Sequence, residues 1–153
     1  MSLIDEGGTS VEETAIKLAV RDYYARAAER GCCGTAGEEC CGTPDDTCRP
    51  TGVGQEHLAG IPSLGCGSPV EAADLQPGEV VLDLGSGRGL DAFRGAERVG
   101  PGGRVIGVDM APEMVWRAGA DAARLGLPQA EFRLGEIEAL PLAEASVDAV
   151  ISN

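Results

Sequence analysis

Short apolar runs alternate with amphipathic stretches through the second half of the chain. Four runs have the length and composition of buried strands: Val80–Leu82, Arg104–Val108, Glu131–Leu134 and Val147–Ile151. A helical pattern, DAFRGAERV, follows the first run, and another extends from near Pro112 to Leu125 after the second. This regular alternation predicts an α/β fold built on a parallel, Rossmann-like sheet.

The pattern before residue 68 is different. Ser10–Glu13 form a capping box, and a helix is expected from there to about Arg30. Its apolar stripe consists of Ile16, Val20, Tyr23 and Ala27. A segment rich in Gly, Pro, Thr and Cys follows, and a second capping box at Ser68–Glu71 places proline at the first helical position. We therefore expect an N-terminal helix and cysteine-rich segment over 1–67, and a Rossmann-like domain over 68–153.

The last residues bear on how complete this domain is expected to be. The chain stops at Asn153, inside or just after the fourth strand, whereas a parallel strand is normally covered by helices on both faces. The pattern predicts a sheet truncated after its fourth strand, with an open apolar edge. Such a chain is expected to be marginally stable and inactive or nearly so by itself.

The turn after the first strand carries the most specific functional signal. It reads Asp83-Leu84-Gly85-Ser86-Gly87-Arg88-Gly89 and joins a strand to a helix, the position of a nucleotide-binding loop in such sheets. Glycine permits positive φ and the close approach of a ligand. Asp109 ends the second strand, where an acid accepts hydrogen bonds from ribose hydroxyls.

Two features narrow the choice of nucleotide. Leu90 stands where the dinucleotide motif G-x-G-x-x-G requires glycine, and no G-K-[ST] indicates a P-loop. Asp83 before the turn favours a ligand with an ammonium group and repels a pyrophosphate. S-adenosylmethionine has an ammonium group, a ribose and no phosphate, so we expect it as the cofactor.

Charge and composition exclude several classes of partner. The chain has 12 basic and 25 acidic residues, a net charge of −13, which disfavours nucleic acid and anionic membranes as partners. No apolar run approaches the length of a membrane span, and the first residues do not resemble a signal peptide. We expect a cytoplasmic protein with reduced thiols, in which six cysteines indicate soft-ion binding or redox chemistry rather than disulfides.

Several motifs taken together resemble the arsenite S-adenosylmethionine methyltransferases. They are SLGCGSP, VVLDLGSGRGLDAF, GRVIGVDMAPEM and EFRLGEIEALPLAEASVDAVISN, within a resemblance that covers about Val20 to Asn153. It implies a class-I methyltransferase fold. The residues implied around the methionine part of the cofactor are Asp83, Gly85, Ser86, Gly87 and Gly89. Those implied around the rest of the cofactor are Asp109 on the ribose, Met110, Glu136 and Ile137 at the adenine, and Asn153 nearby.

The resemblance also implies a site for trivalent arsenic, As(III), because soft thiolates select soft ions. Cys66 matches the family's cysteine in LGCG, and Cys32 or Cys33 matches its N-terminal cysteine, with Cys40 and Cys41 as further candidates. The family has two more arsenic-binding cysteines beyond the position of Asn153. The expected reaction is methyl transfer from S-adenosylmethionine to thiolate-bound arsenic, with a thiol reductant such as thioredoxin or glutathione as partner.

Other interpretations of these residues stay open. A zinc site fits poorly, because the cysteine pairs are vicinal rather than spaced as C-x₂₋₄-C. His57 has no carboxylate or serine partner in the sequence and is expected to be structural. The protein could methylate another small molecule with the same cofactor, or be a non-catalytic fragment that binds S-adenosylmethionine or a thiophilic ion.

Overall fold

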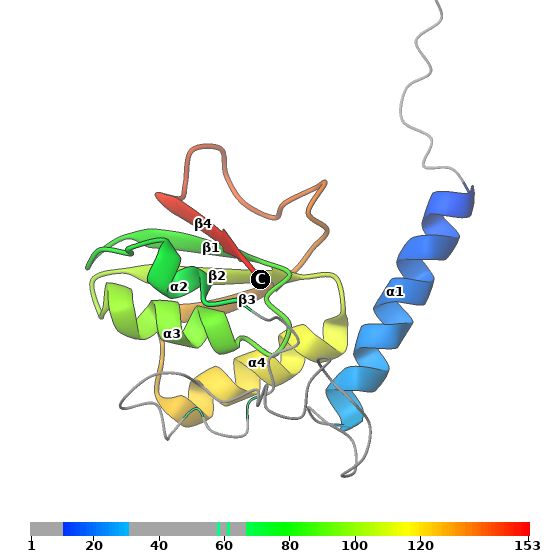
Figure 1. Cartoon of the computed structure of the whole chain (residues 1–153), viewed down its shortest axis with the longest axis horizontal. Helices are drawn as coiled ribbons and strands as arrows, with labels where there is room; N and C mark the ends of the chain where they lie inside the picture. Colours follow the sequence, from blue (N-terminus) through cyan, green and yellow to red (C-terminus); the bar gives the residue numbers. More distant parts are fainter. Residues whose placement is uncertain (1–10, 31–57, 59–60, 62–66) are drawn as a thin grey trace, which may run out of the picture.

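A computed structural model describes residues 11–30, 58, 61 and 67–153 of the chain, and its centre is a parallel sheet (Figure 1). The strands are β1 (Val80–Leu84), β2 (Arg104–Asp109), β3 (Ala130–Leu134) and β4 (Ala149–Ser152), in the order β3-β2-β1-β4. The chain therefore moves outward from β1 in one direction and returns to its other side with β4. A crevice at the carboxyl ends of the strands, where the order reverses, is the usual ligand site of such sheets.

The helices confirm the predicted alternation. α3 (Leu90–Val99) and α4 (Pro112–Leu125) connect neighbouring strands and cover the same face of the sheet (Figure 1). α1 (Val11–Arg30) lies beside α4, and α2 (Pro69–Ala72) is a single turn. No helix within these ranges is both long and apolar enough to cross a membrane.

The core follows from the alternation of side chains along the strands. Val81 of β1 packs with Val105 of β2 and with Phe93 of α3 in the main cluster, whereas Leu82 faces the opposite side of the sheet. Aromatic residues are scarce, and the two phenylalanines meet each other: the rings of Phe93 and Phe132 are 5.5 Å apart, edge to face. Small aliphatic side chains fill most of the remaining core, as the composition predicts.

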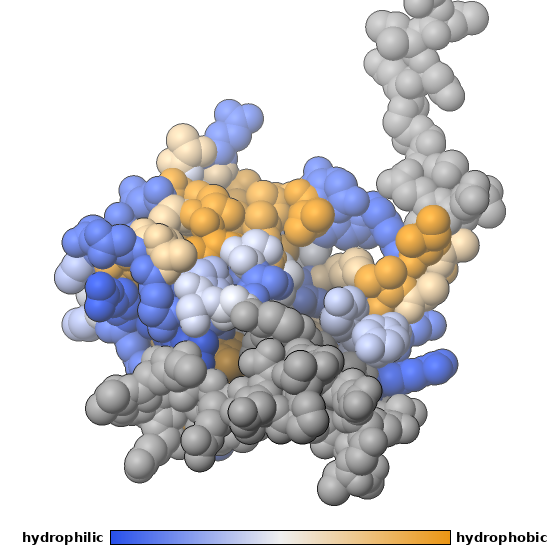
Figure 2. Space-filling model, in the orientation of Figure 1, coloured by the Kyte–Doolittle hydropathy of each residue, from blue (hydrophilic) through white to orange (hydrophobic). Residues whose placement is uncertain are grey.

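The structure differs from the sequence pattern at two places. The stripe on α1 is not buried: Ile16 is 60% exposed and Tyr23 69%, and apolar side chains are visible along this helix in Figure 2. The side chain of Ser68 makes no capping hydrogen bond, because its ψ of 71° is not the extended conformation that directs a cap toward the helix. Pro69 does occupy the first helical turn, as predicted.

Candidate cofactor site

The turn after β1 has the conformation that its glycines allow. Gly85, Gly87 and Gly89 have φ values of +68°, +52° and +83°, in the left-handed region. A Cβ added to Gly85 or Gly87 would meet nothing within 4 Å, so the backbone there is open to a ligand. At Gly89, in contrast, a Cβ would lie 2.6 Å from the ring of Phe132. The first two glycines thus leave room above the turn, and the third is required by packing.

Asp109 is fixed against this turn at the end of β2. One carboxylate oxygen accepts a hydrogen bond from the Gly87 N–H at 2.9 Å, and the other accepts one from the Ala111 N–H at 2.9 Å. Each oxygen keeps a further lone pair, since a carboxylate accepts about four hydrogen bonds. The predicted ribose acceptor therefore lies beside the glycine turn in a fixed orientation.

Asp83 is the most unusual side chain of the site. It is 2% exposed, and its Oδ2 has no hydrogen-bond partner. Burial, together with the negative charges of Asp91 and Asp109, raises the pKa of Asp83 to about 7, although a hydrogen bond from the backbone of Ala92 acts in the opposite direction. A buried carboxylate oxygen without a partner is rare, and an ammonium group of a ligand would satisfy it.

Ser86 adds a second unsatisfied group inside the turn. Its hydroxyl is buried and has no hydrogen-bond partner. The N–H groups of Gly85 and Ser86 both donate to the Val108 carbonyl, at 2.9 and 3.1 Å, and tie the turn to β2. The site therefore fits a small polar cofactor. It has open space above two glycines, two polar atoms without partners, and the fixed carboxylate of Asp109.

A cavity of about 370 Å³ lies at the carboxyl ends of β2 and β3, where Met110 follows Asp109. Its walls are Lys17, Leu18, Arg21, Met110, Pro112, Leu134, Gly135 and Glu136. Met110 and Glu136, both predicted at the adenine, therefore face the same space. Ile137 is 64% exposed and does not line the cavity, so its contact with the adenine face stays a prediction.

The sequence did not indicate how Asn153 is used. Its side chain donates to Asp91 at 2.8 Å and to the Gly67 carbonyl at 3.1 Å, and its Oδ1 accepts the Gly67 N–H at 2.9 Å. Arg94 lies 3.3 Å from Asp91. These contacts hold Gly67 at the carboxyl edge of the sheet.

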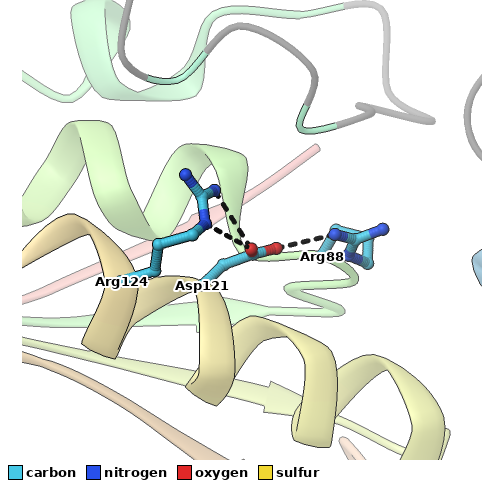
Figure 3. A network of polar contacts seen from close by, with 3 residues as sticks. All are labelled: Arg88, Asp121 and Arg124. Carbon is cyan, nitrogen blue, oxygen red and sulfur yellow. Dashed lines mark hydrogen bonds and ion pairs between the residues drawn. The ribbon is translucent and has the colours of Figure 1, made fainter.

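A polar network holds the other side of the turn to α4 (Figure 3). Arg88 lies 2.6 Å from Asp121, and Arg124 lies 3.1 Å from the other oxygen of the same carboxylate. Burial alone would raise the pKa of Asp121, but the hydrogen bonds from Arg88 and Arg124 outweigh it and lower the pKa. The turn is therefore anchored on both flanks.

The predicted arsenic ligands cannot be placed. Cys32, Cys33 and Cys66, the further candidates Cys40 and Cys41, and His57 all lie outside the described residues. Within the part of the chain that the structure describes, no group of three or more His, Cys, Asp or Glu side chains is placed to hold a metal ion. The arsenic site therefore stays a prediction.

A parallel sheet in this order, with a glycine turn after β1 and an acid at the end of β2, defines the class-I methyltransferase fold. The methyltransferase-domain model matches residues 75–153, and the chain belongs to this family. A crystal structure of an arsenic(III) S-adenosylmethionine methyltransferase from Chlamydomonas reinhardtii is 38% identical, with a TM-score of 0.53 over 65% of this chain and 38% of that one. An S-adenosylmethionine-dependent methyltransferase from Aquifex aeolicus is 32% identical, with a TM-score of 0.51 over 53% and 43%.

Curated relatives agree with the structural ones. An arsenite methyltransferase of Halobacterium salinarum is 44% identical over 93% of this chain and 40% of its own length. A nocamycin O-methyltransferase of Saccharothrix syringae is 48% identical over 44% of this chain and 24% of its own. The chain thus spans less than half the length of these relatives. The matches confirm the predicted resemblance to arsenite methyltransferases, the fold class and S-adenosylmethionine as the cofactor of the family.

Proposed function

We propose that the chain binds S-adenosylmethionine across the glycine turn and serves the methylation of thiolate-bound trivalent arsenic. The observation that carries the cofactor assignment is Asp83, a buried carboxylate with one unpartnered oxygen, adjacent to a turn with open space above its backbone. The ammonium group of the cofactor supplies the missing partner. A pyrophosphate at the same position would face the negative charges of Asp83, Asp91 and Asp109.

The roles of the other site residues follow from their positions. When bound, the cofactor supplies an electrophilic methyl group on a sulfonium sulfur. Gly85, Ser86, Gly87 and Gly89 surround its methionine part, and Asp109 accepts from the ribose. Met110, Glu136 and Ile137 receive the adenine, and Asn153 holds the neighbouring segment. The arsenic lone pair requires no general base for attack, so these residues act by positioning and by excluding water.

Arsenic as substrate is supported by where the similarity lies. The match to the Halobacterium salinarum arsenite methyltransferase covers 93% of this chain. The few residues outside the match are fewer than those of the segment 32–66, so the match must include most of that segment. That segment contains all six cysteines. Cys66 with Cys32 or Cys33 are the proposed thiolate ligands, and a thiol such as thioredoxin or glutathione is the proposed reductant. The boundary between 1–67 and 68–153 is part of the same proposal.

A competition experiment tests the ion. The reduced chain is titrated with arsenite and with zinc, each in the presence of the other, and Cys66→Ser is the matched variant. We expect arsenite to displace zinc, and Cys66→Ser to lose arsenite binding while keeping its affinity for the cofactor. A stoichiometric zinc that arsenite does not disturb would overturn the assignment.

A second candidate is methylation of another small molecule. The nocamycin O-methyltransferase match supports it, because that similarity is high but limited to 44% of this chain. A shared cofactor site explains such a match without a shared substrate. Cofactor affinity that is unchanged by arsenite and by all cysteine substitutions would favour this candidate.

A further inference from the structure

The cavity at the carboxyl ends of β2 and β3 is built from two parts of the chain that are far apart in sequence. Met110 and Glu136 come from the ends of β2 and β3, whereas Lys17, Leu18 and Arg21 come from α1. A volume of about 370 Å³ lies within the range of small-molecule sites. α1 thus provides three of the eight lining residues.

Polar contacts hold α1 at this cavity. The Lys17 ammonium lies 2.8 Å from Glu136 and 3.2 Å from Glu138, in the segment that follows β3. The hydrogen bonds to these two carboxylates raise the pKa of Lys17. Ile16 and Tyr23 of the same helix remain largely exposed, so burial of the apolar stripe does not explain the position of the helix.

The lining has the chemistry that a nucleobase requires. Leu18 of α1 and Met110 with Leu134 of the sheet provide apolar side chains around the cavity. A flat aromatic base binds between such groups, while its edge needs donors and acceptors. Lys17 and Arg21 offer donors, and Glu136 offers an acceptor for an amino group.

We propose that α1 forms one wall of the cofactor site and that Lys17 is a positioning residue, which holds Glu136 toward the nucleobase end of bound S-adenosylmethionine. This inference rests on the proposed function. Lys17 compensates the charge of Glu136 and Glu138 at the rim, and Leu18 covers the base from the solvent side. Cofactor bound in this way dissociates only when α1 moves away from the segment after β3.

The test measures binding of S-adenosylhomocysteine, which has the nucleoside of the cofactor but no methyl group to transfer. Lys17→Met removes both ion pairs and keeps the aliphatic stem. Arg26→Met is the matched control, because Arg26 lies on the exposed surface of α1 and does not line the cavity. We expect Lys17→Met to weaken binding about 3- to 10-fold through faster dissociation, as two partly exposed ion pairs allow. Lys17→Arg should restore affinity to within about twofold.

A second measurement does not depend on affinity. Amide hydrogen exchange of α1 should slow when S-adenosylhomocysteine is added to the wild type and to Arg26→Met, and this protection should be lost in Lys17→Met. Equal affinity and equal protection in Lys17→Met and Arg26→Met would overturn the role of α1. Tighter binding by Lys17→Met would also overturn it, because the ion pair would then compete with the ligand. Absence of binding by the wild type would instead refute the proposed function, and this inference with it.

Discussion

Replacing Asp83 by asparagine should make the protein more stable and a weaker cofactor binder. The side chain is 2% exposed, and burial beside Asp91 and Asp109 raises its pKa from 3.8 to about 7. Between about pH 4 and pH 7, Asp83 is therefore protonated in the native state and ionised in the unfolded chain. Stability falls as the pH rises through this window, because the native state then binds more protons than the unfolded state. Asparagine has nearly the same shape and cannot ionise.

The magnitude follows from the width of the window. The wild type should lose about 2 kcal/mol of its free energy of unfolding through Asp83 between pH 5 and pH 7, and about 3 kcal/mol by pH 8, because the loss is about 1.4 kcal/mol per pH unit and levels off near the native pKa. Asp83→Asn lacks this loss. Its free energy of unfolding should therefore exceed that of the wild type only slightly at pH 5, and by about 3 kcal/mol more at pH 8. Urea unfolding at four pH values measures the difference between the two proteins. Glu144→Gln, at an exposed loop position, is the control and should show no such trend.

Binding should respond in the opposite direction. Asp83→Asn should weaken S-adenosylhomocysteine binding by about 1.5–3 kcal/mol, the scale of a hydrogen bond to a charged group. Wild-type affinity should rise between pH 5 and 8, because Asp83 must lose its proton before it pairs with an ammonium group. The reasoning is refuted if the stability gap between Asp83→Asn and the wild type is the same at pH 5 and pH 8.

Three other substitutions test the parts around the turn. Asp109→Ala should weaken cofactor binding by about 1.5–3 kcal/mol in calorimetry, and unchanged affinity would remove it from the site. Arg88→Met should destabilise the chain by about 1 kcal/mol at pH 7 in urea unfolding, because it removes one partner of the partly buried Asp121 carboxylate. Since the pKa of Asp121 is lowered, this loss should disappear as the pH falls below the ordinary aspartate value, and a loss independent of pH would contradict the ion-pair explanation. Gly89→Ala should lower the melting temperature more than Gly85→Ala, because only the former places a Cβ 2.6 Å from a phenylalanine ring; equal losses would leave φ strain as the whole cause.

The sequence predicted the parts of this molecule that depend on local pattern. Apolar runs and turn residues located the strands and helices to within a few residues, and α4 from Pro112 to Leu125 was predicted at both ends. The glycine turn and Asp109 could be predicted as cofactor-binding because that role requires particular residue types at a fixed spacing. These signals lie within about 30 residues of one another, and neighbouring βαβ units bring such residues together without further information.

The parts that were missed depend on contacts across the whole chain. Asn153 pairs with Gly67 and Asp91, and no periodicity relates these three positions. An apolar stripe is typical of a helix that faces the core, but Ile16 and Tyr23 of α1 are exposed and Lys17 instead pairs with Glu136. The second capping box was also misleading, because Ser68 precedes only a single helical turn. In each case the tertiary arrangement determines the contacts of the residue, and a local motif does not encode that arrangement.

The strand order has a consequence for how the molecule folds. β1, β2 and β3 are neighbours both in sequence and in the sheet, so each pairing closes only a short stretch of chain. β4 must instead find β1 across 68 residues, as in the hydrogen bond from Val80 to Asp148, and Lys17 must find Glu136 across 119. Loop closure disfavours such distant contacts early in folding. We therefore expect α3, α4 and the first three strands to form the folding nucleus. Substitutions at Lys17 and Asn153 would then speed unfolding while leaving the refolding rate nearly unchanged, so the protein assembles its scaffold before it completes its binding site.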